Sequence, residues 1–209
     1  MLPHLSLPVV DQLLAHRNWR TDWTLERTCL YWYLTFDDEP ELAALFEELT
    51  PGLRRIENVD AVPADWLHLT VLEVGYADEV VRSDVAAMVA AAETIRDLMP
   101  LRLDLGPVST MTDAVVLGVH PSPEVLAVRA TLAEGLGTLR RPHDEGFWPH
   151  VSIGYLNTDC RREEVMAAFE NVVPRTVSVT VPRLTLAAVT RLETHYQWQS
   201  VARLPTGQP

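Results

Sequence analysis

The sequence predicts an α+β fold made of two similar halves, with antiparallel sheets and helices outside them. Segments typical of strands and of helices follow one another without the strict alternation of a parallel sheet. One short pattern also occurs in each half: a histidine, an apolar residue, a hydroxyl residue and a second apolar residue, at His68–Val71 and at His150–Ile153. Each copy lies in an apolar alternating run that is soon followed by glycine and then by a helical pattern. The halves are therefore expected to repeat one arrangement.

The first half begins with residues 1–24, an N-terminal extension to which the sequence assigns no function. A short helix is expected there over 9–16. A strand rich in aromatic and branched residues follows over 28–36. Asp38 and Glu41 have the spacing of a capping box, which predicts a helix that Pro51-Gly52 stops after about Leu49. The remaining predicted elements are a strand at 66–74, an amphipathic helix at 78–98 and two strands at 101–108 and 114–120.

The second half is also predicted to contain both helices and strands. Its predicted elements are a helix at 123–139, a loop at 140–148, a strand at 149–155, a helix at 159–172 and closing strands at 175–181, 184–192 and 195–204. No linker rich in glycine or serine separates the halves. Residues 25–209 are therefore expected to form one domain.

The repeated pattern predicts chemistry on one face of each strand. Side chains alternate between faces, so His68 and Thr70 project together, as do His150 and Ser152. Two imidazoles and two hydroxyls can then converge on one anion. His4 begins a third match, but it lies at the extreme N-terminus and is soon followed by Pro8, so we regard it as incidental.

The surroundings of both motifs resemble the two-histidine phosphoesterase superfamily. This superfamily includes bacterial RNA 2′,3′-cyclic phosphodiesterases, historically called 2′-5′ RNA ligases, and cyclic nucleotide phosphodiesterases. The similar segments are 64–75, with a polar lead-in, a His-x-Thr strand and a glycine, and 147–155, with Pro-His followed by serine in place of the commoner threonine. The resemblance implies two pseudo-symmetric lobes around a central cleft lined by the motif strands.

Tyr155 stands five residues after the second motif histidine, where RNA-ligase-like members tend to have a basic residue. This is similar to the plant-type cyclic phosphodiesterase pattern, and it favours a small cyclic phosphate over a long RNA. Tyr155 is therefore a candidate substrate-binding residue, with core or rim packing as the alternative. Trp66 and Trp148 flank the motifs and could form a platform for a base, but closing the core is the simpler role.

The resemblance implies metal-independent hydrolysis of a 2′,3′-cyclic phosphate, without a cofactor. His68 and His150 would serve as general base and general acid, because histidine titrates near neutral pH. Thr70 and Ser152 would donate hydrogen bonds to the phosphate oxygens as charge accumulates there. Which histidine is the base stays open at this point. The family implies release of the 3′ oxygen, which leaves a 2′-phosphate.

Composition restricts the partner and the location. The 209-residue chain has a formal net charge of −12, and its basic side chains are all arginine. A long nucleic acid would be repelled, so a nucleotide or an RNA terminus is the expected partner. The sequence shows no secretory pattern and no apolar run long enough to span a bilayer, which predicts a cytoplasmic protein without membrane contact. Two cysteines without a CxxC spacing favour neither a disulfide framework nor a zinc site. The oligomeric state is not predicted.

Alternative functions stay open. The same site could act on 2′-5′ or cyclic oligonucleotides, or the chain could be a non-catalytic nucleotide-binding module. His143, Asp144 and Glu145 could suggest a metal hydrolase, but their spacing matches no familiar ligand motif and a solvated loop explains them better. Arg140 and Arg141 could attract an anion or could simply follow a helix C-terminus.

Overall fold

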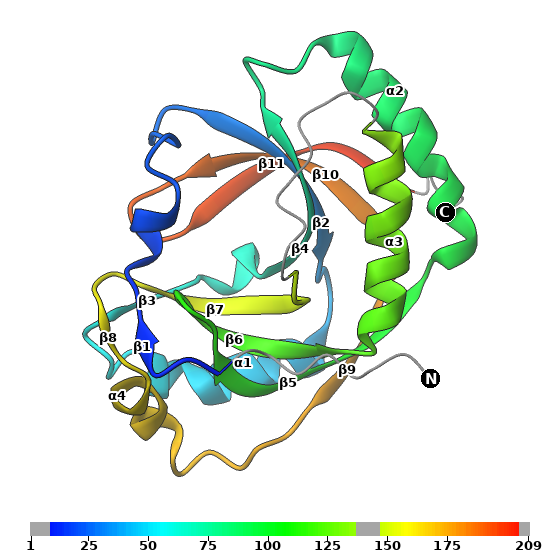
Figure 1. The fold of residues 1–209 in the computed structure, drawn as a ribbon. Helices are drawn as coiled ribbons and strands as arrows, with labels where there is room; N and C mark the ends of the chain where they lie inside the picture. The colour runs from blue at the N-terminus through cyan, green and yellow to red at the C-terminus, as the bar shows by residue number, and fades with distance from the viewer. Residues whose placement is uncertain (1–8, 137–146, 205–209) are drawn as a thin grey trace.

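Two curved antiparallel sheets form the centre of the protein, with helices on their outer sides (Figure 1). The computed structural model describes residues 9–136 and 147–204. The first sheet has the order β11-β10-β2-β4, with β2 Thr28–Thr35, β4 His68–Tyr76, β10 Leu184–Arg191 and β11 Tyr196–Leu204. The second has the order β3-β7-β6-β5-β9, with β3 Val59–Ala61, β5 Leu101–Thr110, β6 Ala114–His120, β7 His150–Leu156 and β9 Val177–Val181. A small third sheet pairs β1 Gln12–Leu13 with β8 Cys160–Arg161.

The helices are divided between the two sheets. The four described α-helices are α1 Pro40–Leu53, α2 Arg82–Ala92, α3 Ser122–Gly135 and α4 Arg162–Met166. α2 and α3 pack against each other, and α3 also packs against β4 of the first sheet (Figure 1). α1 packs against β3 and β9 of the second sheet. The predicted α+β class with two antiparallel lobes is thus confirmed.

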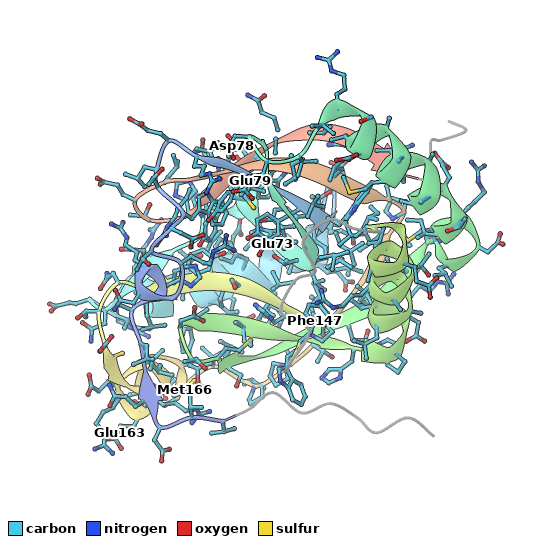
Figure 2. The ribbon with its side chains drawn as sticks, turned by 45° about the horizontal axis from the view of Figure 1, so that its top comes forward. Glu73, Asp78, Glu79, Phe147, Glu163 and Met166 are labelled. Carbon is cyan, nitrogen blue, oxygen red and sulfur yellow. The ribbon has the colours of Figure 1, made fainter. Side chains whose placement is uncertain are left out.

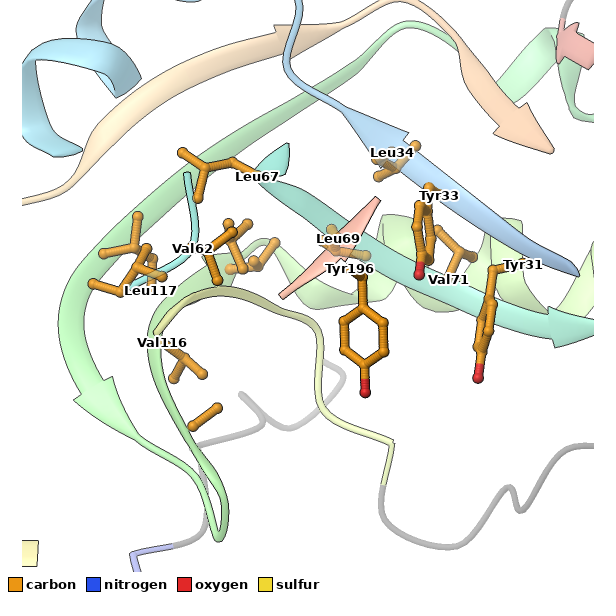
Figure 3. Close-up of a cluster of buried hydrophobic side chains, with 14 of the residues drawn as sticks. Tyr31, Tyr33, Leu34, Val62, Leu67, Leu69, Val71, Val116, Leu117 and Tyr196 are labelled. Carbon is orange, nitrogen blue, oxygen red and sulfur yellow. The ribbon is translucent and has the colours of Figure 1, made fainter. Parts of the chain in front are cut away.

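The alternation along β4 explains how the core and the polar face are separated. Leu69 and Val71 are fully buried, and Leu67, the residue before this strand, belongs to the same cluster of buried side chains (Figure 3). His68 and Thr70 occupy the intervening positions and therefore point to the opposite face. Burial of the leucine and valine side chains fixes the register, since a slip of one residue would exchange the two faces. Packing of the buried residues of β4 therefore fixes the position of His68.

The helix α1 differs from its predicted form at both ends. It begins at Pro40 after Glu39, without a side-chain cap, and Asp38 has a φ of 59°, so the predicted capping box is wrong. Proline at the first helical position starts the helix through its fixed φ. The helix also continues through Pro51 to Leu53. Close packing explains why glycine suits position 52: a Cβ there would lie 2.8 Å from the Phe169 ring.

Other boundaries differ where helices are short. The expected helix at 78–98 is α2 followed by a 3-10 segment, Glu93–Leu98, and the one at 159–172 is reduced to α4 and the 3-10 turn Ala167–Phe169. The helix expected at 9–16 is wrong, because this segment contains β1 and is followed by the 3-10 turn His16–Trp19. Cys29 and Cys160 are buried free thiols. Within the described residues, no helix combines the length and the apolar character needed to cross a membrane.

Candidate active site

The two motif histidines occupy equivalent places in the two sheets. His68 begins β4 and His150 begins β7, and these strands pack against each other although they belong to different sheets. The His68 Nδ1 atom lies 2.8 Å from the carbonyl of Trp66, and the His150 Nδ1 atom lies 2.6 Å from the carbonyl of Trp148. A carbonyl only accepts hydrogen bonds, so Nδ1 carries the proton in both rings. Each neutral imidazole therefore keeps its lone pair on Nε2.

Burial keeps both imidazoles neutral at neutral pH. His68 is only 6% exposed, and burial lowers its pKa to about 4; the Trp66 carbonyl opposes this effect, and nearby His150 adds to it. Burial also lowers the pKa of His150, against the opposing effects of the Trp148 carbonyl and the Asp113 carboxylate. The strands that carry the two rings, β4 and β7, pack against each other, so both imidazoles can be directed to one phosphate.

The low pKa of His68 predicts a loss of stability in acid. The unfolded chain binds this proton near pH 6.5 and the folded protein near pH 4, so protonation favours unfolding between these values. This group alone should lower the free energy of unfolding by about 3 kcal/mol from pH 6.5 to pH 4. Urea unfolding across this range should show a smaller decrease for His68→Gln than for the wild type. Equal decreases would contradict the assigned burial of His68.

A tyrosine lies near each motif hydroxyl. Tyr33 is paired with Thr70 across β2 and β4, and Tyr155 lies on β7 with Ser152; in each case the hydroxyl acts to lower the pKa of the phenol. Burial raises the pKa of both phenols, so they keep their protons at neutral pH. The arrangement of histidine, hydroxyl and tyrosine is thus repeated in the two lobes. Tyr155 is only 7% exposed, so burial limits its direct contact with a ligand.

Aromatic rings hold His68 in place. Tyr33 stacks on the imidazole with 4.1 Å between ring centroids, and Trp198 contacts it edge-on at 5.0 Å. Trp66 in turn contacts Trp198 edge-on at 4.8 Å, so its ring supports the wall beside His68. Figure 3 shows Tyr31, Tyr33 and Tyr196 with their hydroxyl groups pointing in the same direction. The alternation of Tyr31 and Tyr33 in the sequence is the signal that could have assigned both to the polar face.

A cavity of about 1010 Å³ lies beside His68, and its lining includes the preceding residue, Leu67, but none of the four motif side chains. Thr35, which is paired with His68 across β2 and β4, lines it together with Trp198. Its lining also includes four carboxylates and one guanidinium, which belong to Asp37, Asp38, Glu39, Asp65 and Arg203. An indole ring and several acceptors of hydrogen bonds are therefore available next to the candidate base.

A second cluster at the Tyr155 end was not anticipated. His16 stacks on Tyr155 with 4.2 Å between ring centroids and lies 2.8 Å from a carboxylate oxygen of Asp113. The Tyr196 hydroxyl is 2.7 Å from the other imidazole nitrogen of His16. No local pattern marks His16, because its partners lie far away in the sequence. The extension thus contributes a side chain next to the motif residues.

The side chains that could bind a metal ion are dispersed in the part of the chain that the structure describes. Residues 9–136 and 147–204 contain no group of three or more histidine, cysteine or acidic side chains that could hold a metal ion. His4, Arg140, Arg141 and the cluster His143, Asp144 and Glu145 lie outside the described residues.

Comparison with known families gives the chain its classification. The model of the 2′-5′ RNA ligase superfamily matches residues 37–191, a stretch that contains both motif strands. The chain belongs to this superfamily. The resemblance found in the two motif segments is therefore confirmed, and membership supports a phosphodiesterase-like or RNA-ligase-like enzyme. No curated protein matches the chain.

Solved structures share the superfamily fold. TT0787 of Thermus thermophilus is 18% identical, with a TM-score of 0.66, covering 84% of this chain and 96% of its own. E. coli LigT complexed with 3′-AMP is 19% identical, with a TM-score of 0.61 and coverage of 85% and 97%. The MHV ns2 PDE domain is 11% identical, with a TM-score of 0.52 and coverage of 76% and 97%. At these identities the likeness concerns the fold.

Proposed function

We propose that this protein is a metal-independent phosphodiesterase that opens a 2′,3′-cyclic phosphate on a nucleotide, an ADP-ribose derivative or an RNA terminus. The observation that carries the proposal is the paired geometry of the motifs. Each lobe supplies an imidazole with its Nε2 lone pair unprotonated and a hydroxyl on the same face of the strand. Membership of the superfamily supports the same class of reaction.

The electrostatics favour His68 as the base. Its pKa of about 4 keeps Nε2 unprotonated at neutral pH, so it can remove a proton from the attacking water. Burial lowers the pKa of His150 as well, but the Asp113 carboxylate opposes this effect and an anionic phosphate would oppose it further, so His150 is the imidazole that takes up a proton with the substrate and then acts as the acid. The neighbouring His16 acts in the opposite direction and lowers the pKa of His150.

The reaction then proceeds by in-line displacement at phosphorus. Water forms the new P–O bond as its proton moves to His68 Nε2. The bond from phosphorus to the 3′ oxygen breaks, and this oxygen takes the proton from His150 Nε2. Thr70 and Ser152 donate hydrogen bonds to the non-bridging oxygens, where negative charge increases in the transition state. The product is a 2′-phosphate.

Among the substrates named, charge favours a nucleotide with one phosphate over an ADP-ribose derivative or an RNA terminus, which carry further phosphates. The chain carries a net charge of −12, and the cavity beside His68 is lined by Asp37, Asp38, Glu39 and Asp65. These carboxylates would repel further phosphates but can accept hydrogen bonds from ribose hydroxyls or from the amino groups of a base. Trp198 offers a ring on which a base can stack. E. coli LigT has been crystallised with 3′-AMP, ATP and NADP⁺, which makes nucleotides the first ligands to test.

A substrate panel in excess EDTA tests this proposal. We expect turnover of 2′,3′-cyclic AMP, at least tenfold slower turnover when a 5′-phosphate is added, and no turnover of 3′,5′-cyclic AMP. Product analysis should give the 2′-phosphate alone. Turnover of only 2′-5′-linked or cyclic oligonucleotides would contradict the substrate class. Binding of 2′,3′-cyclic AMP without turnover would contradict the enzymatic function. Direct contact of Tyr155 with the substrate and the cytoplasmic location stay predictions.

A further inference from the structure

An N-terminal strap, residues 11–27, docks on both sheets. On the side of the second sheet, β1 pairs with β8, and the backbone N–H of Leu14 donates to the carbonyl of Thr112 over 2.8 Å. Thr112 lies in the turn between β5 and β6. The first part of the strap is therefore tied to the second sheet by its backbone. Figure 1 shows β1 beside the second sheet, at the left edge of the view.

The rest of the strap is tied to the first sheet by arginines. Arg191, on β10, donates to the carbonyls of Arg20, Trp23 and Arg17 over 2.8, 3.2 and 3.1 Å. In return, Arg20 donates to Glu73 over 2.8 Å, and Arg27 donates to Asp78 and Glu79. These three carboxylates lie in one part of the molecule (Figure 2). The strap thus spans from one sheet to the other.

His16 lies where the strap passes between the sheets, and its two ring nitrogens reach different sheets. Nδ1 is 2.8 Å from Asp113, in the β5–β6 turn, and Nε2 is 2.7 Å from the hydroxyl of Tyr196, on β11. The side chain is only 14% exposed, and its ring covers Tyr155. Tyr155 itself contacts Tyr196 edge-on at 5.4 Å across the sheets. An imidazole is rigid, so these two contacts fix a distance between the lobes.

The contacts of His16 with Asp113 and Tyr196 form a bridge between the sheets. This bridge lies next to the candidate catalytic groups. Tyr155, which stacks under the His16 ring, lies on β7 three residues after Ser152, which shares its face of the strand with His150. A shift of the His16 ring would move Tyr155 and with it the Ser152 hydroxyl. It would also alter the separation of β4 and β7, which carry the two histidines. Displacements of about 1 Å at a reacting centre can cost 10²-fold in rate.

We infer that His16 is a positioning residue that sets the spacing of the two lobes and so aligns the catalytic groups of β7 with those of β4. This inference rests on the proposed phosphodiesterase function. Both His16 and Tyr196 lie outside residues 37–191, the part that matches the superfamily. The strap therefore adds a component to this active site that the two motifs do not contain.

Two isosteric replacements separate the two halves of the bridge. The amide nitrogen of asparagine can take the place of Nδ1, so His16→Asn keeps the contact with Asp113 and loses the contact with Tyr196. The amide nitrogen of glutamine takes the place of Nε2, so His16→Gln keeps the contact with Tyr196 and loses the contact with Asp113. We expect each variant to lower kcat for 2′,3′-cyclic AMP about tenfold with KM within twofold, because substrate contacts persist while alignment is lost. Tyr196→Phe should lower kcat in the wild type but have little further effect in His16→Asn, since both remove the same contact.

Two controls identify a merely structural role. His195→Gln changes a histidine whose hydrogen bonds to Thr194 and Gln197 stay within its own hairpin. Arg27→Gln removes a tether of the same strap to Asp78 and Glu79. Both should keep wild-type kcat. A loss in Arg27→Gln equal to that in His16→Asn would overturn the inference, because general loosening of the strap would then explain both.

Backbone hydrogen exchange provides a readout that does not need activity. We expect faster exchange in β7 and at the start of β11 in both His16 variants, with no change there in His195→Gln. Wild-type exchange and wild-type kcat in the His16 variants would overturn the inference. If the wild type itself hydrolyses no cyclic phosphate, the proposed function fails, while unchanged or faster exchange still decides whether His16 holds the lobes together.

Discussion

Replacing either His68 or His150 with glutamine is expected to lower kcat for 2′,3′-cyclic AMP by about 10³-fold, within the range of general acid–base catalysis. The glutamine amide takes the place of Nε2 but cannot exchange protons near neutral pH, and it gives up the Nδ1 hydrogen bond to the carbonyl of Trp66 or Trp148. Each variant therefore removes one proton transfer and replaces the imidazole with a neutral side chain of similar length. Steady-state kinetics at pH 7 measure the loss.

The losses of kcat in the His68 and His150 variants should not be additive. When base and acid act in one step, the double variant should be little slower than either single variant, as for other groups that act as a unit. Circular dichroism should confirm that all three proteins are folded, and His195→Gln should retain full activity. A loss below tenfold in either single variant would mean that the paired motifs do not perform the chemistry.

Removing one motif hydroxyl is expected to lower kcat by about 10²-fold. Thr70→Val and Ser152→Ala each delete a donor that the proposal aims at a non-bridging phosphate oxygen, and oxyanion donors contribute effects of this size. KM should change little, because the hydrogen bond strengthens as charge increases in the transition state. Kinetics with 2′,3′-cyclic AMP give kcat and KM separately.

Conservative replacements provide the matched controls. Ser152→Thr and Thr70→Ser keep the hydroxyl, so both should retain activity within about fivefold of the wild type. Equal losses in Ser152→Thr and Ser152→Ala would instead indicate that steric fit to Tyr155, and not hydrogen bonding to the phosphate, determines the effect.

The motif strands could be predicted from sequence because their pattern is local. Leu69 and Val71 alternate with polar residues, and this alternation predicts which face of β4 is buried. Val151 and Ile153 predict the buried face of β7 in the same way. The two copies of the pattern place a histidine and a hydroxyl residue at equivalent positions of β4 and β7. The family and the bilobal fold followed from these segments.

The features that could not be predicted depend on contacts between distant segments. His16 has neighbours that suggest nothing about its role, and its partners Asp113 and Tyr196 are 97 and 180 residues away. The end of α1 shows the same limit, since packing against Phe169 carries the helix past Pro51, where local signals predict a stop. Local patterns therefore identified the candidate catalytic pair but not the side chains that hold it.

The proposed reaction requires that two histidines open a cyclic phosphate without a metal ion. A phosphorus NMR time course of 2′,3′-cyclic AMP in excess EDTA, with wild type beside His150→Gln, tests it most directly. Conversion to a single 2′-monophosphate resonance by the wild type, with no detectable conversion by the variant, is the predicted result. Equal conversion by both proteins, or conversion by the wild type only after a divalent metal is added, would contradict the claim.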